Sequence, residues 1–239
     1  MTLKAVLFDF NGVIINDERI HEQLLNDILL GENLRLRPGE YQQVCLGRSD
    51  RACLKDLLMR QGRVVSDDYL SQLVLKKTQA YQAQLAQLDV LPTFPGLTDF
   101  IYQLRVAHIS LAIVSGAVRA EIELVLQRAK LADYFSVIVA GDEISSSKPD
   151  PDGYLLAVER LNQLNPTLKL KPSECLALED TFAGIQAAKK AGISVVGVAN
   201  TYPFHMMQRR ANWAVDYLNE LELERIQRWF AGEERSVAA

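Results

Sequence analysis

Short apolar runs recur along this chain, and from Phe94 onward they alternate with stretches of helical character. Each run is too short for most helices and has the composition of a strand. Strands that alternate with helices are typical of an α/β fold built on a parallel sheet. The expected strands are Ala5–Phe8, Ser110–Val114, Val137–Ala140, Glu174–Leu178, Val195–Val198 and a short one at Trp213–Val215.

The pattern changes between about Asn16 and Leu88. This segment is rich in Leu, Gln, Lys, Arg and Asp, and its apolar residues recur at helical spacing. Such spacing predicts several amphipathic helices packed together. Leu91–Gly96 is rich in turn-forming residues and is expected to be the return linker. The expected organisation is an α/β core formed by residues 1–15 and 92–239, with residues 16–91 inserted after the first strand as a helical cap.

The overall composition is that of a soluble globular protein, with 49% apolar and 23% charged residues. The net charge of −4 argues against general affinity for nucleic acid, because a phosphate backbone rewards clustered Lys and Arg. No apolar run approaches the roughly 20 residues that span a bilayer, so we expect no membrane segment. The last stretch, Leu221–Ala239, is expected to form a terminal helix that frays at its end.

The three cysteines, Cys45, Cys53 and Cys175, are too few and too scattered for a disulfide framework. No C-x-x-C spacing suggests zinc. Cys45 and Cys53 are eight residues apart, and we expect a core or surface role for them rather than redox chemistry. The N-terminus runs directly into a strand and has no secretory pattern, so we expect a reducing, cytoplasmic setting.

Four polar segments follow strands or open helices in the predicted core. In chain order they are Asp9, Ser115-Gly116, Lys148-Pro149 and Glu179-Asp180. Open α/β sheets bind their ligands at the carboxyl edge of the strands. We therefore expect all four segments to meet at one edge of the sheet and to form one site.

Together these segments resemble the four motifs of the haloacid dehalogenase (HAD) superfamily, in order and in spacing, over roughly residues 3–220. The segments SSKPDPDGY and LEDTFAGIQAAKKAG make the resemblance specific. The helical insert resembles the small C1 cap of the β-phosphoglucomutase-like subfamily. The resemblance implies a Rossmann-like HAD core with a parallel sheet, an inserted α-helical cap, and phosphoryl transfer that depends on Mg²⁺.

The resemblance assigns the nucleophile and the metal ligands to acidic residues. Asp9 would attack the phosphoryl group and form an aspartyl-phosphate, which splits one hard hydrolysis into two easier steps. Mg²⁺ would be held by Asp9, by the backbone carbonyl of Asn11 and by Asp180. Glu179 would act as a ligand directly or through water. Because residue 11 contributes its backbone carbonyl, an Asn at this position does not remove that ligand.

The phosphoryl oxygens would be held by Ser115 and by the backbone amides of Gly116 and Ala117, near a helix start. Lys148 would neutralise the charge that develops during transfer. These assignments follow from the resemblance. With the acidic residues, they are all the site residues that we expect the α/β core to contribute.

Substrate choice is expected to come from the cap, which would close over the nucleophile and exclude water. His21 matches a family residue that contacts the reacting acid. Lys77 resembles a position that binds the distal group of the substrate. The segment Leu46–Arg51 resembles the subfamily's specificity loop, and either of its arginines could grip an anionic or hydroxylated substrate. The expected cap contacts are His21, Gly47, Arg48, Arg51 and Lys77.

Asn11 departs from the family pattern, which has a second Asp at this position. That Asp protonates the leaving group and then activates water, and an amide can do neither. We expect a loss of the order of 10²–10⁴-fold, the usual contribution of general acid–base catalysis. Three readings stay open: a natural member with weak or specialised activity, a catalytically silent protein that keeps the metal site, and a substitution introduced into an active enzyme.

The leading expectation is a Mg²⁺-dependent phosphatase that acts on a small phosphomonoester through an aspartyl-phosphate on Asp9. The alternatives are a β-phosphoglucomutase-like phosphomutase and a silent HAD protein that binds phosphate ligands or regulates a partner. A mutase must protonate and deprotonate sugar hydroxyls, the task that Asn11 cannot perform. The expected partner is a small phosphate ester, with no nucleic acid and no membrane, and the sequence predicts no oligomeric state.

Overall fold

The computed structural model describes residues 1–233 of the chain. Within this part, six strands form one parallel sheet in the order β3-β2-β1-β4-β5-β6. The predicted α/β fold is confirmed, and every strand boundary lies within one residue of its predicted position. The strands are β1 (Ala5–Phe8), β2 (Ser110–Val114), β3 (Val137–Val139), β4 (Cys175–Glu179), β5 (Ser194–Val198) and β6 (Trp213–Val215).

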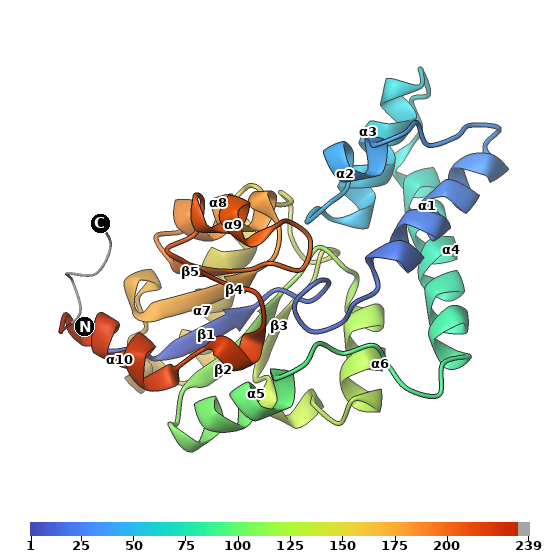
Figure 1. Cartoon of the computed structure of the whole chain (residues 1–239). Helices are drawn as coiled ribbons and strands as arrows, with labels where there is room; N and C mark the ends of the chain where they lie inside the picture. The colour runs from blue at the N-terminus through green and yellow to red at the C-terminus, as the bar shows by residue number, and fades with distance from the viewer. Residues whose placement is uncertain (234–239) are drawn as a thin grey trace.

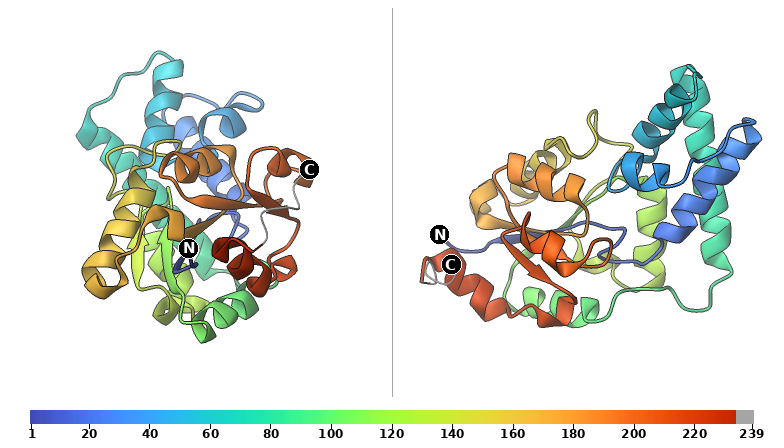
Figure 2. Two further views of the ribbon diagram at one scale, coloured as in Figure 1. Left: turned by 90° about the vertical axis from the view of Figure 1, so that its left-hand side faces the viewer. Right: turned by 45° about the horizontal axis from the view of Figure 1, so that its top comes forward.

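Helices cover both faces of the sheet (Figures 1 and 2), because successive side chains of a strand point to opposite faces and both faces are apolar here. Val6 and Phe8 of β1 pack into one apolar cluster, whereas Ala5 and Leu7 pack into the other. The first cluster includes α5 (Leu97–Val106), α6 (Arg119–Arg128) and α10 (Leu223–Ala231), and the second includes α7 (Asp152–Leu164), α8 (Phe182–Lys190) and α9 (Phe204–Gln208). Short 3-10 helices lie at Ala132–Tyr134, Pro166–Leu168, Pro172–Glu174 and Leu218–Glu220.

The segment between β1 and α5 forms the predicted amphipathic helices, which stand beside the carboxyl edge of the sheet (Figure 1). Two of these helices begin at serine N-caps: Ser49 Oγ accepts a hydrogen bond from the backbone N–H of Ala52, and Ser66 Oγ accepts one from that of Tyr69. Their apolar faces enclose a separate core that includes Leu25, Leu54 and Leu70. We call this segment the helical insert; its helices are α1 (Glu18–Gly31), α2 (Glu40–Val44), α3 (Asp50–Arg60) and α4 (Asp67–Ala86).

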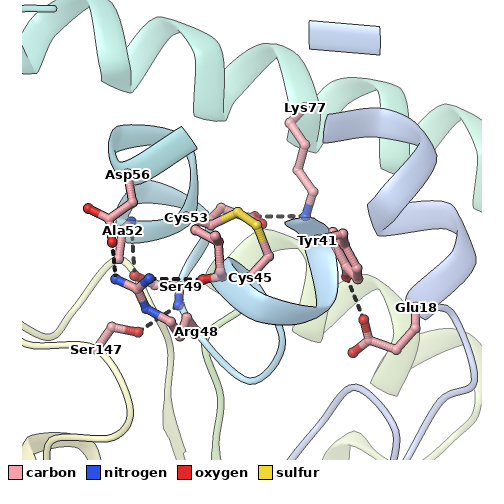
Figure 3. The surroundings of a disulfide bond; sticks show 12 residues. Glu18, Tyr41, Cys45, Arg48, Ser49, Ala52, Cys53, Asp56, Lys77 and Ser147 are labelled. Carbon is pink, nitrogen blue, oxygen red and sulfur yellow. Dashed lines mark hydrogen bonds and ion pairs between the residues drawn. A yellow bond between two sulfur atoms is a disulfide. The ribbon is translucent and has the colours of Figure 1, made fainter. Parts of the chain in front are cut away.

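One expectation for the cysteines is wrong, because the structure joins Cys45 and Cys53 by a disulfide bond (Figure 3). Cys45 directly follows α2 and Cys53 lies in the first turn of α3. The intervening loop turns back on itself, so that the two Cα atoms come within 4.9 Å of each other. A spacing of eight residues does not reveal such a turn. Cys175, the remaining cysteine, is buried in β4.

The C-terminal helix is shorter than the predicted stretch of Leu221–Ala239. It is α10, which ends at Ala231 and buries Ile226 and Phe230 against the sheet. Residues 234–239, which contain most of the expected frayed end, lie outside the described residues. Among the helices of residues 1–233, none combines the length and the apolar character that a bilayer span requires.

Candidate active site

Neighbouring parallel strands bring the predicted acidic residues to one edge of the sheet. Asp9 follows β1, and its backbone N–H donates to the carbonyl of Leu178 in the adjacent β4. Glu179 ends β4 and Asp180 comes next. All three acids are buried, and one carboxylate oxygen from each lies within 4.8 Å of the others. The predicted convergence of these three side chains is therefore confirmed.

Lys148 connects two of these acids. Its Nζ lies 2.8 Å from Asp9 Oδ1 and 2.7 Å from Glu179 Oε1. Burial alone would lower the pKa of Lys148, but the carboxylates of Asp9 and Glu179 outweigh it and hold the pKa above its ordinary value. The lysine is therefore a permanent cation in this site. Tyr154 supports the arrangement from α7 by donating its hydroxyl to Glu179 Oε1 at 2.5 Å.

The acidic cluster carries more negative charge than Lys148 can neutralise. Burial, together with the negative charge of Asp9, raises the pKa of Glu179 to about 8 and that of Asp180 well above its ordinary value. Asp180 Oδ2 accepts a hydrogen bond from the Thr201 hydroxyl, whereas Asp180 Oδ1 is buried without a hydrogen-bond partner. Clustered carboxylate oxygens that include an unpartnered one suit a hard divalent cation such as Mg²⁺. The residues present therefore fit the expected metal.

The turn after β1 requires a glycine at residue 12. Gly12 has a φ of +77°, and a Cβ there would lie 1.8 Å from Asp180 Oδ2. Asn200 donates its side-chain Nδ2 to the carbonyl of Gly12 at 2.5 Å. This close approach brings the loop that carries Asp9 and Asn11 directly against the end of β4.

The predicted phosphate loop follows β2. The backbone N–H of Ser115 donates to the carbonyl of Val139 at 2.9 Å, which extends the pairing of β2 with β3 beyond the strand. Ser115 Oγ accepts a hydrogen bond from the backbone N–H of Ala117 at 3.0 Å. One of the amides expected to hold a phosphoryl group is thus engaged with the serine hydroxyl in this structure.

A narrow cavity lies between the helical insert and this edge of the sheet. The core contributes residues from three loops, and the insert contributes residues from α1, α2 and the loop that the disulfide brackets. Lys148 and Ser115 are not among the lining residues, since they are buried behind the others. The lining includes Asp9, Asn11, Gly116, Ala117 and Thr181 from the core, and Glu18, His21, Tyr41, Gly47 and Arg48 from the insert.

Asn11 is held by a buried group of side chains from the insert. Its Nδ2 lies 3.0 and 3.1 Å from the two carboxylate oxygens of Asp17 and 2.9 Å from His21 Nε2. His21 Nε2 also lies 3.2 Å from Asp17 Oδ2. Tyr81 donates its hydroxyl to the same Asp17 oxygen at 2.5 Å, and its ring stacks on that of His21. The structure thus brings the predicted His21 to residue 11, together with Asp17.

Asp17 and His21 shift each other's pKa in opposite directions. Burial by itself would raise the pKa of Asp17, but the charge and the hydrogen bond of His21, with hydrogen bonds from Asn11 and Tyr81, lower it. Burial and Lys77 would lower the pKa of His21, but Asp17 raises it above its ordinary value. The two groups therefore favour the carboxylate–imidazolium form, in which Asn11 Nδ2 and His21 Nε2 both donate to Asp17 and the 2.9 Å contact between these two nitrogens is not a hydrogen bond.

The loop between α2 and α3 docks on the core. A Cβ on Gly47, whose φ is +73°, would lie 2.4 Å from Thr181 Oγ1. The backbone N–H of Ser49 donates to Ser147 Oγ at 2.7 Å, beside Lys148 (Figure 3). The predicted specificity loop therefore contacts two of the core segments that carry the site.

The side chain of Arg48 lines the cavity but is already paired. Its guanidinium lies 2.8 Å from Asp56 Oδ2 and donates to the carbonyl of Val44 at 2.8 Å (Figure 3). Arg51 lies elsewhere, on the surface between α3 and α4, where it pairs with Asp67 at 2.7 Å. Of the two predicted arginines, only Arg48 borders the cavity in this structure.

Lys77 is fully buried and does not line the cavity. Its Nζ lies 2.7 Å from Asp50 Oδ2 and 3.1 Å from Glu121 Oε2. Burial would lower the pKa of Lys77, but Asp50 and Glu121 raise it. This ion pair joins α4 of the insert to α6 of the core, so in this structure Lys77 connects the two parts and does not face a substrate.

Sequence reasoning missed several residues that complete the site. Tyr154 and Thr201 each hold one of the acids at the end of β4, and Tyr41 donates its hydroxyl to Glu18 Oε2 at 2.5 Å inside the cavity. Thr201 carried a usable signal, because it follows β5 at the same edge as the other site residues. The tyrosines carried none, since their apolar spacing is that of ordinary core residues.

Comparison with known proteins agrees with this geometry. Residues 6–198 match the family model described as haloacid dehalogenase-like hydrolase. Protein CbbY of Rhodobacter capsulatus is 29% identical over 224 residues, which cover 92% of this chain and 95% of that protein. β-Phosphoglucomutase of Bacillus subtilis is 29% identical over 211 residues, which cover 84% of this chain and 85% of that enzyme.

The similarity extends to solved structures. The crystal structure of a variant of CbbY from Rhodobacter sphaeroides, in complex with xylulose-(1,5)bisphosphate, is 26% identical to this chain and has a TM-score of 0.79. The alignment covers 92% of this chain and 96% of that chain. The family match therefore spans the sheet from β1 to β5, the helical insert and all four polar segments of the site. This chain belongs to the haloacid dehalogenase-like hydrolases.

Proposed function

We propose that this protein is a Mg²⁺-dependent phosphatase that hydrolyses a small phosphomonoester through an aspartyl-phosphate on Asp9. The observation that carries the proposal is the placement of Asp9, which borders the cavity in front and contacts the Lys148 ammonium behind. A carboxylate held beside a cation can attack a phosphoryl group at modest electrostatic cost. The attack forms the bond between an Asp9 oxygen and phosphorus and breaks the bond to the leaving oxygen.

Asp9, Asp180, Glu179 and the backbone of Asn11 would hold the metal, as the family resemblance implies. Bound Mg²⁺ would supply positive charge between the nucleophile and the anionic phosphoryl group. Lys148 keeps its proton and stabilises charge on the phosphoryl oxygens. The helical insert acts as the cap: its docked loop and α1 close the cavity against water.

Asn11 limits this chemistry at proton transfer. Its amide neither donates a proton to a leaving alkoxide nor removes one from the water that must hydrolyse the aspartyl-phosphate. The first step is then best for substrates whose leaving group needs no proton, such as aryl and acyl phosphates. The second step is slow for every substrate, so phosphoenzyme should accumulate.

Two alternatives differ in what Asn11 allows. A phosphomutase, the activity named for the related β-phosphoglucomutase, must move protons on sugar hydroxyls, which Asn11 does not support. A silent binder of phosphate ligands is favoured by one observation, the hydrogen bonds from the Asn11 amide to Asp17. They hold an amide, which does not titrate, where proton transfer would need an acid. The CbbY relative bound to a sugar bisphosphate supports a phosphorylated carbohydrate as the ligand of either a phosphatase or a binder.

The test is phosphate release with Mg²⁺ from aryl, acyl and sugar phosphates, together with the intact mass of the protein. We expect release from the aryl and acyl phosphates and a mass increase of one phosphoryl group, both lost in Asp9→Asn. A protein that Mg²⁺ and inorganic phosphate stabilise thermally, but that neither releases phosphate nor gains mass, would be a binder.

A further inference from the structure

We propose that Asp17 is a positioning residue for Asn11, which fixes the amide so that Nδ2 faces the buried acid and Oδ1 faces the cavity. The inference rests on the phosphatase proposed above and assigns a role in that reaction to an acid of the helical insert. Asp17 would act through Asn11 and would not itself touch the substrate. The amide of Asn11 would then orient a substrate hydroxyl or a water molecule as a fixed acceptor.

The contacts between the two side chains determine which amide atom points where. An ionised carboxylate can only accept hydrogen bonds, so the atom of Asn11 that faces both Asp17 oxygens must be the donor Nδ2. The two distances, 3.0 and 3.1 Å, lie in the ordinary range for N–H···O hydrogen bonds. The side-chain amide is planar, so holding Nδ2 in the buried pair turns Oδ1 away from it. Asn11 borders the cavity that also contains Asp9.

Asp17 can fix Asn11 because Asp17 is itself held on several sides. It is only 1% exposed. Tyr81 donates to its Oδ2 from α4 at 2.5 Å, and His21 Nε2 lies 3.2 Å from the same oxygen from the next turn of α1. These contacts satisfy the carboxylate and leave it no freedom to turn into the cavity. The core loop that carries Asn11 is thereby joined to two helices of the insert.

The same contacts predict that an acid cannot be restored at residue 11 by one substitution. Asn11→Asp would place a second carboxylate about 3 Å from Asp17, and two carboxylates at that distance do not both ionise readily. The charged groups around them are His21, whose ring contacts both side chains, and the acids Glu18 and Asp9. Beyond His21 lies Lys77, which is paired with Asp50 and Glu121. His21 already compensates Asp17, so the new charge would have no partner. The exchange Asn11→Asp with Asp17→Asn keeps one donor and one acceptor in the pair.

The experiment compares the unaltered protein with Asp17→Asn, Asn11→Asp and the exchange variant, using kcat and KM for an aryl phosphate and a sugar phosphate. We expect Asp17→Asn to lower kcat about tenfold, the usual weight of a hydrogen bond to a charged group, with KM within about twofold. The exchange variant should exceed Asn11→Asp by at least tenfold in kcat for the sugar phosphate, whose leaving group needs a proton. Asp27→Asn, the same substitution at an exposed acid farther along α1, is the matched control and should retain kcat.

A second readout does not depend on turnover. The side-chain ¹⁵N–¹H₂ signals of Asn11, identified by their absence in Asn11→Asp, should show slow hydrogen exchange in the unaltered protein and fast exchange in Asp17→Asn. Unchanged exchange and unchanged kcat in Asp17→Asn, or an Asn11→Asp variant as active as the exchange variant, would overturn the inference. Failure of the phosphatase proposal would give a different result from failure of the Asp17 inference. Phosphate release and phosphoenzyme would then be absent, or would persist in Asp9→Asn, whatever the behaviour of the Asn11 signals.

Discussion

Opening the disulfide between Cys45 and Cys53 should destabilise the protein by an amount that follows from its loop length. The bonded residues are eight positions apart. In the chain-entropy description, a cross-link over a loop of eight residues removes about 8 cal/mol/K from the unfolded chain, or about 2.5 kcal/mol at 25 °C. For a chain of 239 residues, each kcal/mol of stability corresponds to about 2–4 °C in Tm. We therefore expect reduction to lower Tm by about 5–10 °C.

The same reduction should weaken substrate binding, because the disulfide brackets the loop that docks on the core. Both bonded cysteines border the cavity, and the loop between them carries Gly47 and Arg48, which also line it. The loop is fixed on the core by the hydrogen bond from Ser49 to Ser147 (Figure 3). Without the cross-link, ordering this loop costs more on binding, so KM should rise and kcat should change less.

The assay is thermal unfolding with and without a dithiol reductant, beside alkylation and intact mass to count free thiols. The Cys45→Ala/Cys53→Ala variant should resemble the reduced protein and should not respond to reductant. Cys175→Ala is the matched control, because Cys175 lies at the start of β4, away from the site, and its loss should leave the response to reductant intact. The reasoning fails if mass shows a disulfide that opens on reduction while Tm moves by less than about 1 °C. It also fails if all three thiols react before reduction.

Three further predictions concern charge. The pKa of Asp17 is lowered from 3.8 and that of His21 is raised from 6.5, so their pair stabilises the fold fully between these two pH values. Denaturant unfolding should show this stability lost as pH rises through the folded-state pKa of His21 and as pH falls through that of Asp17. The loss at alkaline pH should be absent in His21→Gln. Mg²⁺ should raise Tm by an amount equivalent to about 2.7 kcal/mol at 100 times its Kd, and calorimetric titration of Asp180→Asn should show much weaker binding. Lys77→Met leaves two buried acids without their cation and should cost about 3–5 kcal/mol of unfolding free energy; chemical denaturation should show part of that loss recovered when Glu121→Gln is added.

The strands were predictable because each depends on a local pattern. β1 is a buried apolar run of four residues and β5 contains another, Val195–Val198, and runs this short are typical of strands. Boundaries shifted by one residue where pairing with a neighbour decided the end. Glu179, for example, is the last residue of β4 because it pairs with Gly197 of β5, a partner that sequence spacing does not show.

The acids and the lysine of the site were predictable for the same reason, since each lies at an element end that the parallel topology collects at one edge. The contacts of the insert were not. Lys77 lies in a predicted amphipathic helix and Arg51 at the end of the predicted specificity loop, and neither pattern distinguishes a side chain that meets the core from one that meets solvent. The structure buries Lys77 between Asp50 and Glu121 and leaves Arg51 on the surface with Asp67. Such partners come from tertiary packing, as does the Cys45–Cys53 bond.

The Asn11–Asp17 pair changes what the departure at residue 11 means. Where the family motif has an acid, this chain has an amide, but Asp17 supplies a carboxylate 3.0 Å away, so negative charge is retained at this corner of the site. The retained charge is 1% exposed beneath Asn11 and saturated by Tyr81 and His21, so it cannot reach a leaving group or a water molecule in the cavity. We therefore expect features that depend on charge and shape, such as metal and phosphate binding, to be preserved and proton transfer to be lost. A protein of this kind should turn over its phosphate esters with a low kcat set by the slow second step, and the deficit in kcat/KM should be largest for leaving groups that need a proton.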